Sequence, residues 1–225
     1  IIVMEMLSPH VILRKKLIAG EYVNGLGKTL GNFCARTAFR GSDLSLPTKE
    51  KKKDTALFQG NVELMAITEN LIFTEPYFEA EMNHHTEGLE PVINTLRSDV
   101  SLKQEVQHML VKFTSNTETL LHGDLHSGSV MCTDKETKII DPEFGFYGPM
   151  GFDIGMLISN FLMAYFSQPG HRTENTLEQY QNWILSIIEE IYSTFISEFS
   201  NLWHNERQGI LFPKSLFENQ GHGSE

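Results

Sequence analysis

Leu-His-Gly-Asp-Leu-His-Ser-Gly-Ser occupies residues 121–129 of this chain, and Ile-Ile-Asp-Pro-Glu follows at residues 139–143. Each stretch carries an aspartate among apolar neighbours, Asp124 in the first and Asp141 in the second. The two aspartates are 17 residues apart. Whether they act together therefore depends on how the segment between them folds.

That segment has the pattern of a β-hairpin. Residues 129–133 and 137–140 favour two short strands, and Asp-Lys-Glu at residues 134–136 favours the turn that joins them. A hairpin returns the chain on itself, so it would bring Asp124 and Asp141 to the same end. There, one carboxylate could orient a hydroxyl group and accept its proton, while the other could hold a hard cation such as Mg²⁺.

A third carboxylate belongs to Glu143, which Pro142 separates from Asp141. In an extended segment, residues two apart face the same side, so both carboxylates could reach one metal. Two acids around a proline are also typical of an ordinary turn. The neighbouring His-Gly-Asp-Leu-His stretch is what favours the metal interpretation.

Two other kinds of site stay open. His122, Asp124 and His126 alternate along the chain and could share one face of a strand as zinc ligands. The basic run at residues 49–53 could hold an anion, although a solvated loop or helix edge is the more ordinary interpretation of such a run.

The composition is typical of a globular protein with one large or two small domains. The chain has 225 residues, 40% of them apolar, and a formal net charge of −11. This charge argues against nucleic acid or an anionic membrane as the main partner, because both need a cationic surface. Two cysteines, Cys34 and Cys132, are too few to staple such a fold, so we expect reduced thiols and a cytoplasmic location.

Hydrophobic periodicity predicts mainly helices. Four glycines predict a loop over residues 20–31, and apolar residues predict a buried strand over residues 1–6. The apolar stretch at residues 154–166 is too short to span a membrane, which takes roughly 20 residues, and predicts a helix buried all round. The expected helices cover residues 33–39, 61–73, 100–121, 154–166 and 173–204.

The residues at 122–129 and Asp141-Pro142-Glu143 resemble the aminoglycoside phosphotransferase and choline kinase group, which has the protein-kinase-like fold. The longer string at residues 141–155 narrows the resemblance to the S-methyl-5-thioribose kinase family. Gly-Asn-Val-Glu-Leu at residues 60–64 and Pro-His-Val-Ile-Leu-Arg at residues 9–14 support it. The resemblance covers about residues 1 to 205.

The resemblance implies an α+β fold, namely a protein-kinase-like C-terminal lobe that is mainly helical with a short catalytic β-hairpin. Residues 1–7 would form the last strand of the N-terminal lobe and the hinge, and residues 8–205 the C-terminal lobe. Residues 206–225 would form an irregular tail, for which disorder is one of the expected states. The phosphate-covering loop and its lysine would precede Ile1, so we expect a chain that is incomplete at both ends and weakly active or inactive alone.

The implied activity is ATP-dependent phosphorylation of the 1-hydroxyl of S-methyl-5-thioribose in methionine salvage, with Mg²⁺. Asp124 would bind the sugar hydroxyl and accept its proton. Asp141 would bind the metal, with Glu143 as a second metal or phosphate-side carboxylate, and Pro142 would lie with them in the ATP site. Protein kinases carry a metal-binding asparagine five residues after the catalytic aspartate; here that residue is Ser129, and Glu143 could replace the missing ligand.

The remaining implied roles concern support. The backbone of Glu5, Met6 and Leu7 would hydrogen-bond adenine. His122 would give structural support, and Asp153 would brace the catalytic loop.

Two other functions stay open: a kinase of another small alcohol, such as choline, homoserine or an aminoglycoside, and a non-catalytic remnant. A homodimer is also expected from the resemblance.

Overall fold

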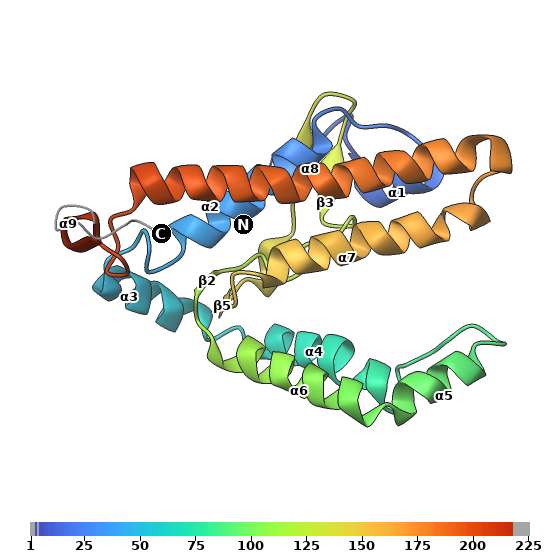
Figure 1. The fold of residues 1–225 in the computed structure, drawn as a ribbon, viewed down its shortest axis with the longest axis horizontal. Coiled ribbons are helices and arrows are strands. Elements are labelled where there is room, and N and C mark those ends of the chain that lie inside the picture. The colour runs from blue at the N-terminus through green and yellow to red at the C-terminus, as the bar shows by residue number, and fades with distance from the viewer. Residues whose placement is uncertain (1–2, 4, 218–225) are drawn as a thin grey trace.

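A computed structural model of the chain describes residues 3 and 5–217. Three helices form its main body: the long α8 (Glu174–Glu206), with α2 (Leu26–Arg40) packed along it and α7 (Phe152–Ser167) against its other end (Figure 1). Leu30, Leu157 and Ile184, one from each helix, are completely buried in the core that they share.

Close contact between α2 and α8 explains why the glycines of α2 lie in a helix. A Cβ atom on Gly27 would lie 2.5 Å from a carboxylate oxygen of Glu190, and one on Gly31 would lie 2.6 Å from the carbonyl oxygen of Ile191. The loop predicted over residues 20–31 is therefore wrong from Leu26 onward, because close packing rather than turn formation requires these two glycines.

Short strands form two small antiparallel sheets. In the first, Val11 pairs with Cys132, and Val130 pairs with Ile139. In the second, Thr119 pairs with Gly148. The strands are β1 (Val11–Ile12), β3 (Val130–Cys132) and β4 (Thr137–Ile139) in one sheet, and β2 (Thr119–Leu120) and β5 (Tyr147–Gly148) in the other.

A helical arm extends from this body below α7 in Figure 1. It consists of α4 (Val62–Phe73), α5 (Glu90–Ser98) and α6 (Val100–Ser115). A cluster of aromatic side chains that includes Phe73 and Phe113 joins it to the strands. The other elements are α1 (Leu13–Ala19), α3 (Thr48–Phe58), η1 (Glu75–Tyr77), η2 (Pro142–Phe144), η3 (Gln168–Gly170) and α9 (Lys214–Phe217).

The structure confirms the helices expected over residues 61–73 and 173–204. The helix expected over residues 100–121 ends at Ser115, because the chain then pairs as β2. Helix α7 is not buried all round: Met163 and Phe166 are 61% and 73% exposed.

Residues 33–39 lie inside the longer α2, and the basic run at residues 49–53 lies in α3. Within that run Lys51 is buried and pairs with Asp43, while Lys49, Lys52 and Lys53 are exposed on the helix surface, so the run is a helix edge.

The strand expected over residues 1–6 is not present in the part that the structure describes. Val3, Glu5 and Met6 have no regular secondary structure, and Val3 and Met6 are almost fully exposed, because no described strand pairs with them. Residues 1, 2 and 4 lie outside the described residues. The hinge predicted at residues 1–7 stays a prediction, as do the predicted C-terminal lobe at residues 8–205 and the predicted tail at residues 206–225.

Within residues 3 and 5–217, no helix is both long and apolar enough to cross a membrane. The two cysteines, Cys34 and Cys132, are buried free thiols.

Candidate active site

The β3–β4 hairpin forms as predicted and brings its two flanking segments together. Beyond the paired strands, the backbone N–H of Ile140 donates a 3.0 Å hydrogen bond to the carbonyl oxygen of Ser129. The end of the loop of residues 122–128 therefore lies beside the start of the segment that begins at Asp141.

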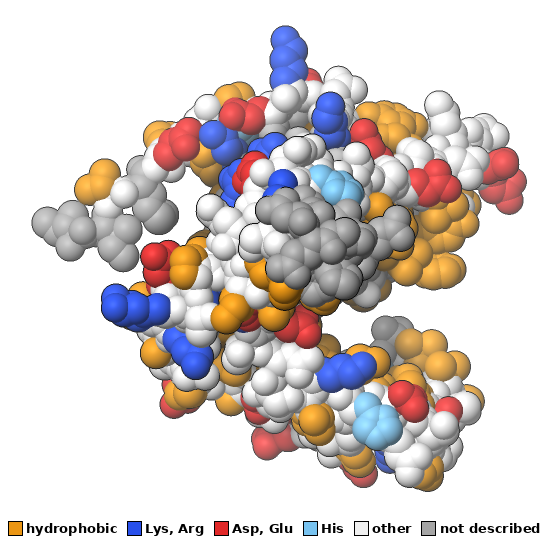
Figure 2. All heavy atoms as spheres, turned by 60° about the vertical axis from the view of Figure 1, so that its left-hand side comes forward, with side chains coloured by type: hydrophobic (Ala, Val, Ile, Leu, Met, Phe, Trp, Pro, Cys, Tyr) orange, Lys and Arg blue, Asp and Glu red, His pale blue; other side chains and the backbone are white. Residues whose placement is uncertain are grey.

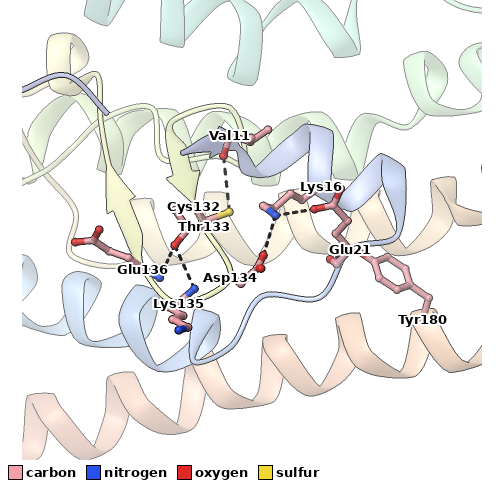
Figure 3. A network of polar contacts seen from close by, with 9 residues as sticks. All are labelled: Val11, Lys16, Glu21, Cys132, Thr133, Asp134, Lys135, Glu136 and Tyr180. Atoms are coloured by element: carbon pink, nitrogen blue, oxygen red, sulfur yellow. Dashed lines mark hydrogen bonds and ion pairs between the residues drawn. The ribbon is translucent and has the colours of Figure 1, made fainter. Parts of the chain in front are cut away.

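At its other end the hairpin is closed by a polar turn (Figure 3). The hydroxyl oxygen of Thr133 accepts hydrogen bonds from the backbone N–H groups of Lys135 and Glu136. The ammonium of the buried Lys16 lies 2.6 Å from a carboxylate oxygen of Glu21 and 3.4 Å from one of Asp134. These contacts join the turn to α1 and raise the pKa of Lys16 above its ordinary value, chiefly through the hydrogen bond to Glu21.

The loop of residues 122–128 is held by Asp153 from the first turn of α7. The Asp153 carboxylate accepts hydrogen bonds from the backbone N–H of His122 at 2.7 Å and of Gly123 at 3.0 Å. Burial raises the pKa of Asp153, and these two hydrogen bonds act in the opposite direction. The geometry is that of a brace between α7 and the loop.

His122 is buried with both ring nitrogens in use. A neutral ring protonated on Nε2 donates to the carbonyl oxygen of Ile140 at 2.9 Å, while Nδ1 accepts from the backbone N–H of Asp124 at 3.3 Å. The zinc alternative is therefore wrong, because His122 has no free nitrogen for a metal. In addition, no group of three or more His, Cys, Asp or Glu side chains among the described residues could hold one.

A glycine brings this loop against the Asp141 segment. Gly123 has φ of +84°, and a Cβ atom there would lie 2.1 Å from the carbonyl oxygen of Phe144, so a larger residue would force the two segments apart. From the arm, the Asn61 amide donates to the carbonyl oxygens of Glu143 at 2.8 Å and Gly145 at 3.0 Å. The two segments and the start of α4 thus form one unit.

Asp124 is partly exposed, with one carboxylate oxygen 3.3 Å from Nε2 of His126. Its backbone carbonyl accepts a 2.8 Å hydrogen bond from the hydroxyl of Ser129. Ser129 is buried, and its hydroxyl shapes the Asp124 loop.

Asp124 and His126 lie at the edge of a groove of about 1040 Å³ between the arm and α7. Figure 2 shows the hollow between the main body and the arm. Apart from Asp124, His126 and Lys112, the lining residues are uncharged, and most of its walls are apolar side chains of α4, α6 and α7. Three of these are methionines: Met109, Met156 and Met163.

Asp141 and Glu143 are exposed, and neither forms an ion pair with another described residue. Asp141 adopts left-handed backbone geometry (φ +66°) and is followed by the η2 turn. Two hard oxygen donors with free coordination positions suit Mg²⁺, which binds through one or two carboxylates and completes its shell with water and phosphate oxygens. The donor set therefore fits the metal that the resemblance implies.

At the N-terminus, Glu5 lies 3.8 Å from the ammonium of Lys138 on β4, and the carbonyl oxygen of Met6 accepts a 3.2 Å hydrogen bond from the backbone N–H of Ser8. Leu7 is partly buried. These residues approach the hairpin, but none of the contacts described for them reaches Asp124.

Reasoning from the residues alone missed the roles of two asparagines. Asn61 holds the Glu143 turn, and the side-chain oxygen of Asn160 accepts a 2.9 Å hydrogen bond from the backbone N–H of Ser127. The local signal for Asn160 was an amide that interrupts the apolar stretch at residues 154–166.

Residues 3–183 match the phosphotransferase enzyme family. The chain is 47% identical to a methylthioribose kinase of Escherichia coli O45:K1 (strain S88 / ExPEC), over 96% of this chain and 52% of the relative. It is 41% identical to methylthioribose kinase 1 of Oryza sativa subsp. japonica, over 89% of this chain and 47% of the relative. The chain thus spans about half the length of the curated relatives it matches.

Among solved structures, glucosamine kinase (crystal form B) is similar with a TM-score of 0.55 and 11% sequence identity, over 89% of this chain and 50% of that one. This likeness concerns the fold alone, and it confirms the expected α+β, kinase-like lobe.

Proposed function

The chain belongs to the phosphotransferase enzyme family, and we propose that it is the catalytic lobe of a kinase that transfers the terminal phosphoryl group of ATP to the 1-hydroxyl of S-methyl-5-thioribose. The observation that carries the proposal is the contact between the Gly123–Asp124 loop and the Asp141–Gly145 segment at the edge of an apolar groove. The names of the relatives, at 41% and 47% identity, support this acceptor.

Asp124 is the proposed general base. Its partly exposed carboxylate lines the groove, where it can orient the acceptor hydroxyl and take its proton as the oxygen attacks phosphorus. The bond from the terminal phosphorus to the bridging oxygen of ATP breaks in the same step, and ADP leaves. Asp153 and Ser129 keep Asp124 in place through the loop backbone.

Asp141 and Glu143 are the proposed Mg²⁺ ligands. When bound, Mg²⁺ would supply charge neutralisation for the phosphate oxygens. Pro142 keeps the two carboxylates on one short turn, and the Asn61 amide holds that turn by its backbone.

The segment formed by Glu5, Met6 and Leu7 is the proposed adenine-binding hinge. The contact between Glu5 and Lys138 of β4 supports this proposal, because β4 belongs to the hairpin that leads to Asp141. Backbone groups of this segment would hydrogen-bond adenine.

The lining of the groove favours a thioether sugar over an aminoglycoside. A methylthio group is apolar and polarizable and packs well against methionine and aromatic side chains. An aminoglycoside is a polycation, yet the groove lining carries a cation, Lys112, and a single carboxylate, Asp124.

A role in methionine salvage follows from the proposed acceptor, and we place the protein in the cytoplasm as a homodimer on the basis of the family resemblance. A non-catalytic remnant is the second candidate, and the test below distinguishes it from a kinase.

The test assays phosphoryl transfer by the 225-residue chain, alone and fused to the segments that the E. coli relative carries outside the matched region. Acceptors are methylthioribose, choline, homoserine and an aminoglycoside, each with ATP and Mg²⁺. We expect the fusion to prefer methylthioribose by about a hundredfold or more in kcat/KM, and the chain alone to be weakly active or inactive. Preference for another acceptor would overturn the substrate assignment, and no turnover of any acceptor by the fusion would favour the remnant.

A further inference from the structure

His126 receives two hydrogen-bond donors on the same ring nitrogen. Its Nδ1 lies 2.7 Å from the backbone N–H nitrogen of Gly128 and 3.3 Å from the Nη2 atom of Arg14. A nitrogen that accepts from an amide and a guanidinium cannot itself carry a proton. The neutral ring must therefore be protonated on Nε2, the atom that lies 3.3 Å from the Asp124 carboxylate.

The surrounding backbone is shaped to keep this arrangement. A Cβ atom on Gly128 would lie 2.4 Å from His126 Cε1 and 2.9 Å from Arg14 Nη2, so glycine leaves the space in which the two side chains meet. The backbone N–H of Arg14 donates to the carbonyl oxygen of Ser127 at 3.1 Å, which ties the start of α1 to the loop.

Arg14 has no ion-pair partner among the described residues, whereas its neighbour Lys16 is held by two carboxylates. Its guanidinium can therefore donate a hydrogen bond to the imidazole of His126 without giving up an ion pair. An arginine is suited to this task because it is always charged and its donors have a fixed planar geometry.

We propose that His126 is a positioning residue that holds one carboxylate oxygen of Asp124 and leaves the other for the acceptor hydroxyl, and that Arg14 and the backbone N–H of Gly128 together position His126 by donating to its Nδ1. The inference about Asp124 rests on the proposed function. The tautomer of His126 does not, because it follows from the contacts of Nδ1 alone.

The first experiment measures the ¹⁵N chemical shifts of the His126 ring in the 225-residue chain by long-range ¹H–¹⁵N correlation. We expect a protonated Nε2 and an unprotonated Nδ1. Arg14→Met should shift the Nδ1 resonance, because one of the two donors to that nitrogen is lost, while the backbone N–H of Gly128 still keeps Nδ1 unprotonated and Nε2 protonated. Lys15→Met removes the same charge from the adjacent position of α1 and should leave the shifts unchanged.

A protonated Nδ1 in the unsubstituted chain would overturn the proposal. Unchanged shifts in Arg14→Met, or equal changes in Lys15→Met, would remove Arg14 from it.

The second experiment compares His126→Gln with His126→Asn in the fused kinase. Glutamine can present an amide N–H close to the place of Nε2, whereas the shorter asparagine reaches only the place of Nδ1. We expect kcat to fall about a hundredfold in His126→Asn and only about tenfold in His126→Gln. The KM for the acceptor should stay nearly unchanged in both variants, because misplacing a reacting group lowers the rate rather than the binding affinity. Equal losses in both variants, or a loss confined to KM, would refute the positioning role.

The two hypotheses can fail separately. A fusion that phosphorylates no acceptor overturns the proposed function and leaves the tautomer result standing. An active kinase with Nδ1 protonated overturns the positioning role alone.

Discussion

The side-chain amide of Asn61 donates a 2.8 Å hydrogen bond to the backbone carbonyl oxygen of Glu143, which lies 82 residues further along the chain. The same nitrogen reaches the carbonyl oxygen of Gly145. The start of the helical arm is thus attached to the turn that carries the proposed metal ligands, so arm and turn cannot move independently without breaking these bonds.

Replacing Asn61 by aspartate should loosen this turn. Aspartate keeps the shape but sets a carboxylate against two carbonyl oxygens, so we expect a loss of about 1–3 kcal/mol in the free energy of unfolding. The Mg²⁺ affinity of the fused kinase with ADP, measured by titration calorimetry, should fall about tenfold. Asn83→Asp is the matched control, because the Asn83 amide donates to the carbonyl oxygen of Glu75, away from the turn. Equal Mg²⁺ affinities in the two variants would contradict this role of Asn61.

Gly123→Ala should be among the most damaging single-methyl additions. Alanine at φ of +84° is strained, and its Cβ would collide with the carbonyl oxygen of Phe144. We expect unfolding at a lower urea concentration, with a loss of about 3 kcal/mol or more, most of which is the collision. Gly155→Ala, near the start of α7 with open space around it, should instead stabilise the protein by roughly 0.5–1 kcal/mol. Similar effects of the two substitutions would show that the close approach at Gly123 is not present in solution.

Asp153→Asn should weaken the brace, because asparagine offers one acceptor oxygen to the two N–H donors of His122 and Gly123. One donor is left buried without a partner, and we expect a loss of about 1–3 kcal/mol at neutral pH, measured by urea denaturation.

The same residue makes stability depend on pH. Burial raises the pKa of Asp153, so the folded state holds this proton to a higher pH than the unfolded chain. Its contribution is fully present below pH 3.8, the ordinary value, and is lost as pH rises through the folded-state pKa. Asp153→Asn should flatten this part of the stability profile. An identical pH profile in Asp153→Asn would contradict the raised pKa.

Asp124→Asn should abolish most turnover of the fused kinase. An amide cannot accept the hydroxyl proton, so we expect kcat to fall by about 10²- to 10⁴-fold with nucleotide affinity preserved. Steady-state kinetics and an ADP-binding isotherm measure the two quantities. Robust turnover in this variant would show that another group is the base.

Lys16→Met should destabilise the turn end of the hairpin by roughly 1 kcal/mol at neutral pH, since its partners Glu21 and Asp134 are largely exposed to solvent (Figure 3). Its raised pKa means that this contribution is fully present below pH 10.5 and disappears as pH rises through the folded-state pKa. The unfolding curves of the two proteins should therefore converge above that pH. A difference that persists in strong alkali would assign the loss to packing rather than to charge.

The hairpin that carries the site could be read from the chain because turn chemistry and strand preference are local properties. Asp-Lys-Glu at residues 134–136 and its flanking strands needed no distant contact to be recognised, and the observed pairing of Val130 with Ile139 follows from them. The amphipathic α4 and α8 were found for the same reason.

The errors occurred where distant packing decides the outcome. Gly27 and Gly31 indicate a loop locally, but they lie in α2 because α8 passes too close for a side chain. Met163 and Phe166 indicate a buried helix locally, but they are exposed on α7, where Met163 lines the groove beside the arm. Neither the packing of α8 against Gly27 and Gly31 nor the exposure of Met163 and Phe166 can be predicted from a pattern of a few neighbouring residues.

Local sequence patterns thus accounted for the nature of the acids at the site and the hairpin that joins them, because both depend on neighbouring residues. The tertiary fold decided which atoms restrain these acids: Asn61 on the metal turn, Asp153 under the loop, and Arg14 behind His126. Such contacts join residues between 31 and 112 positions apart, and they exist only once the helices have packed.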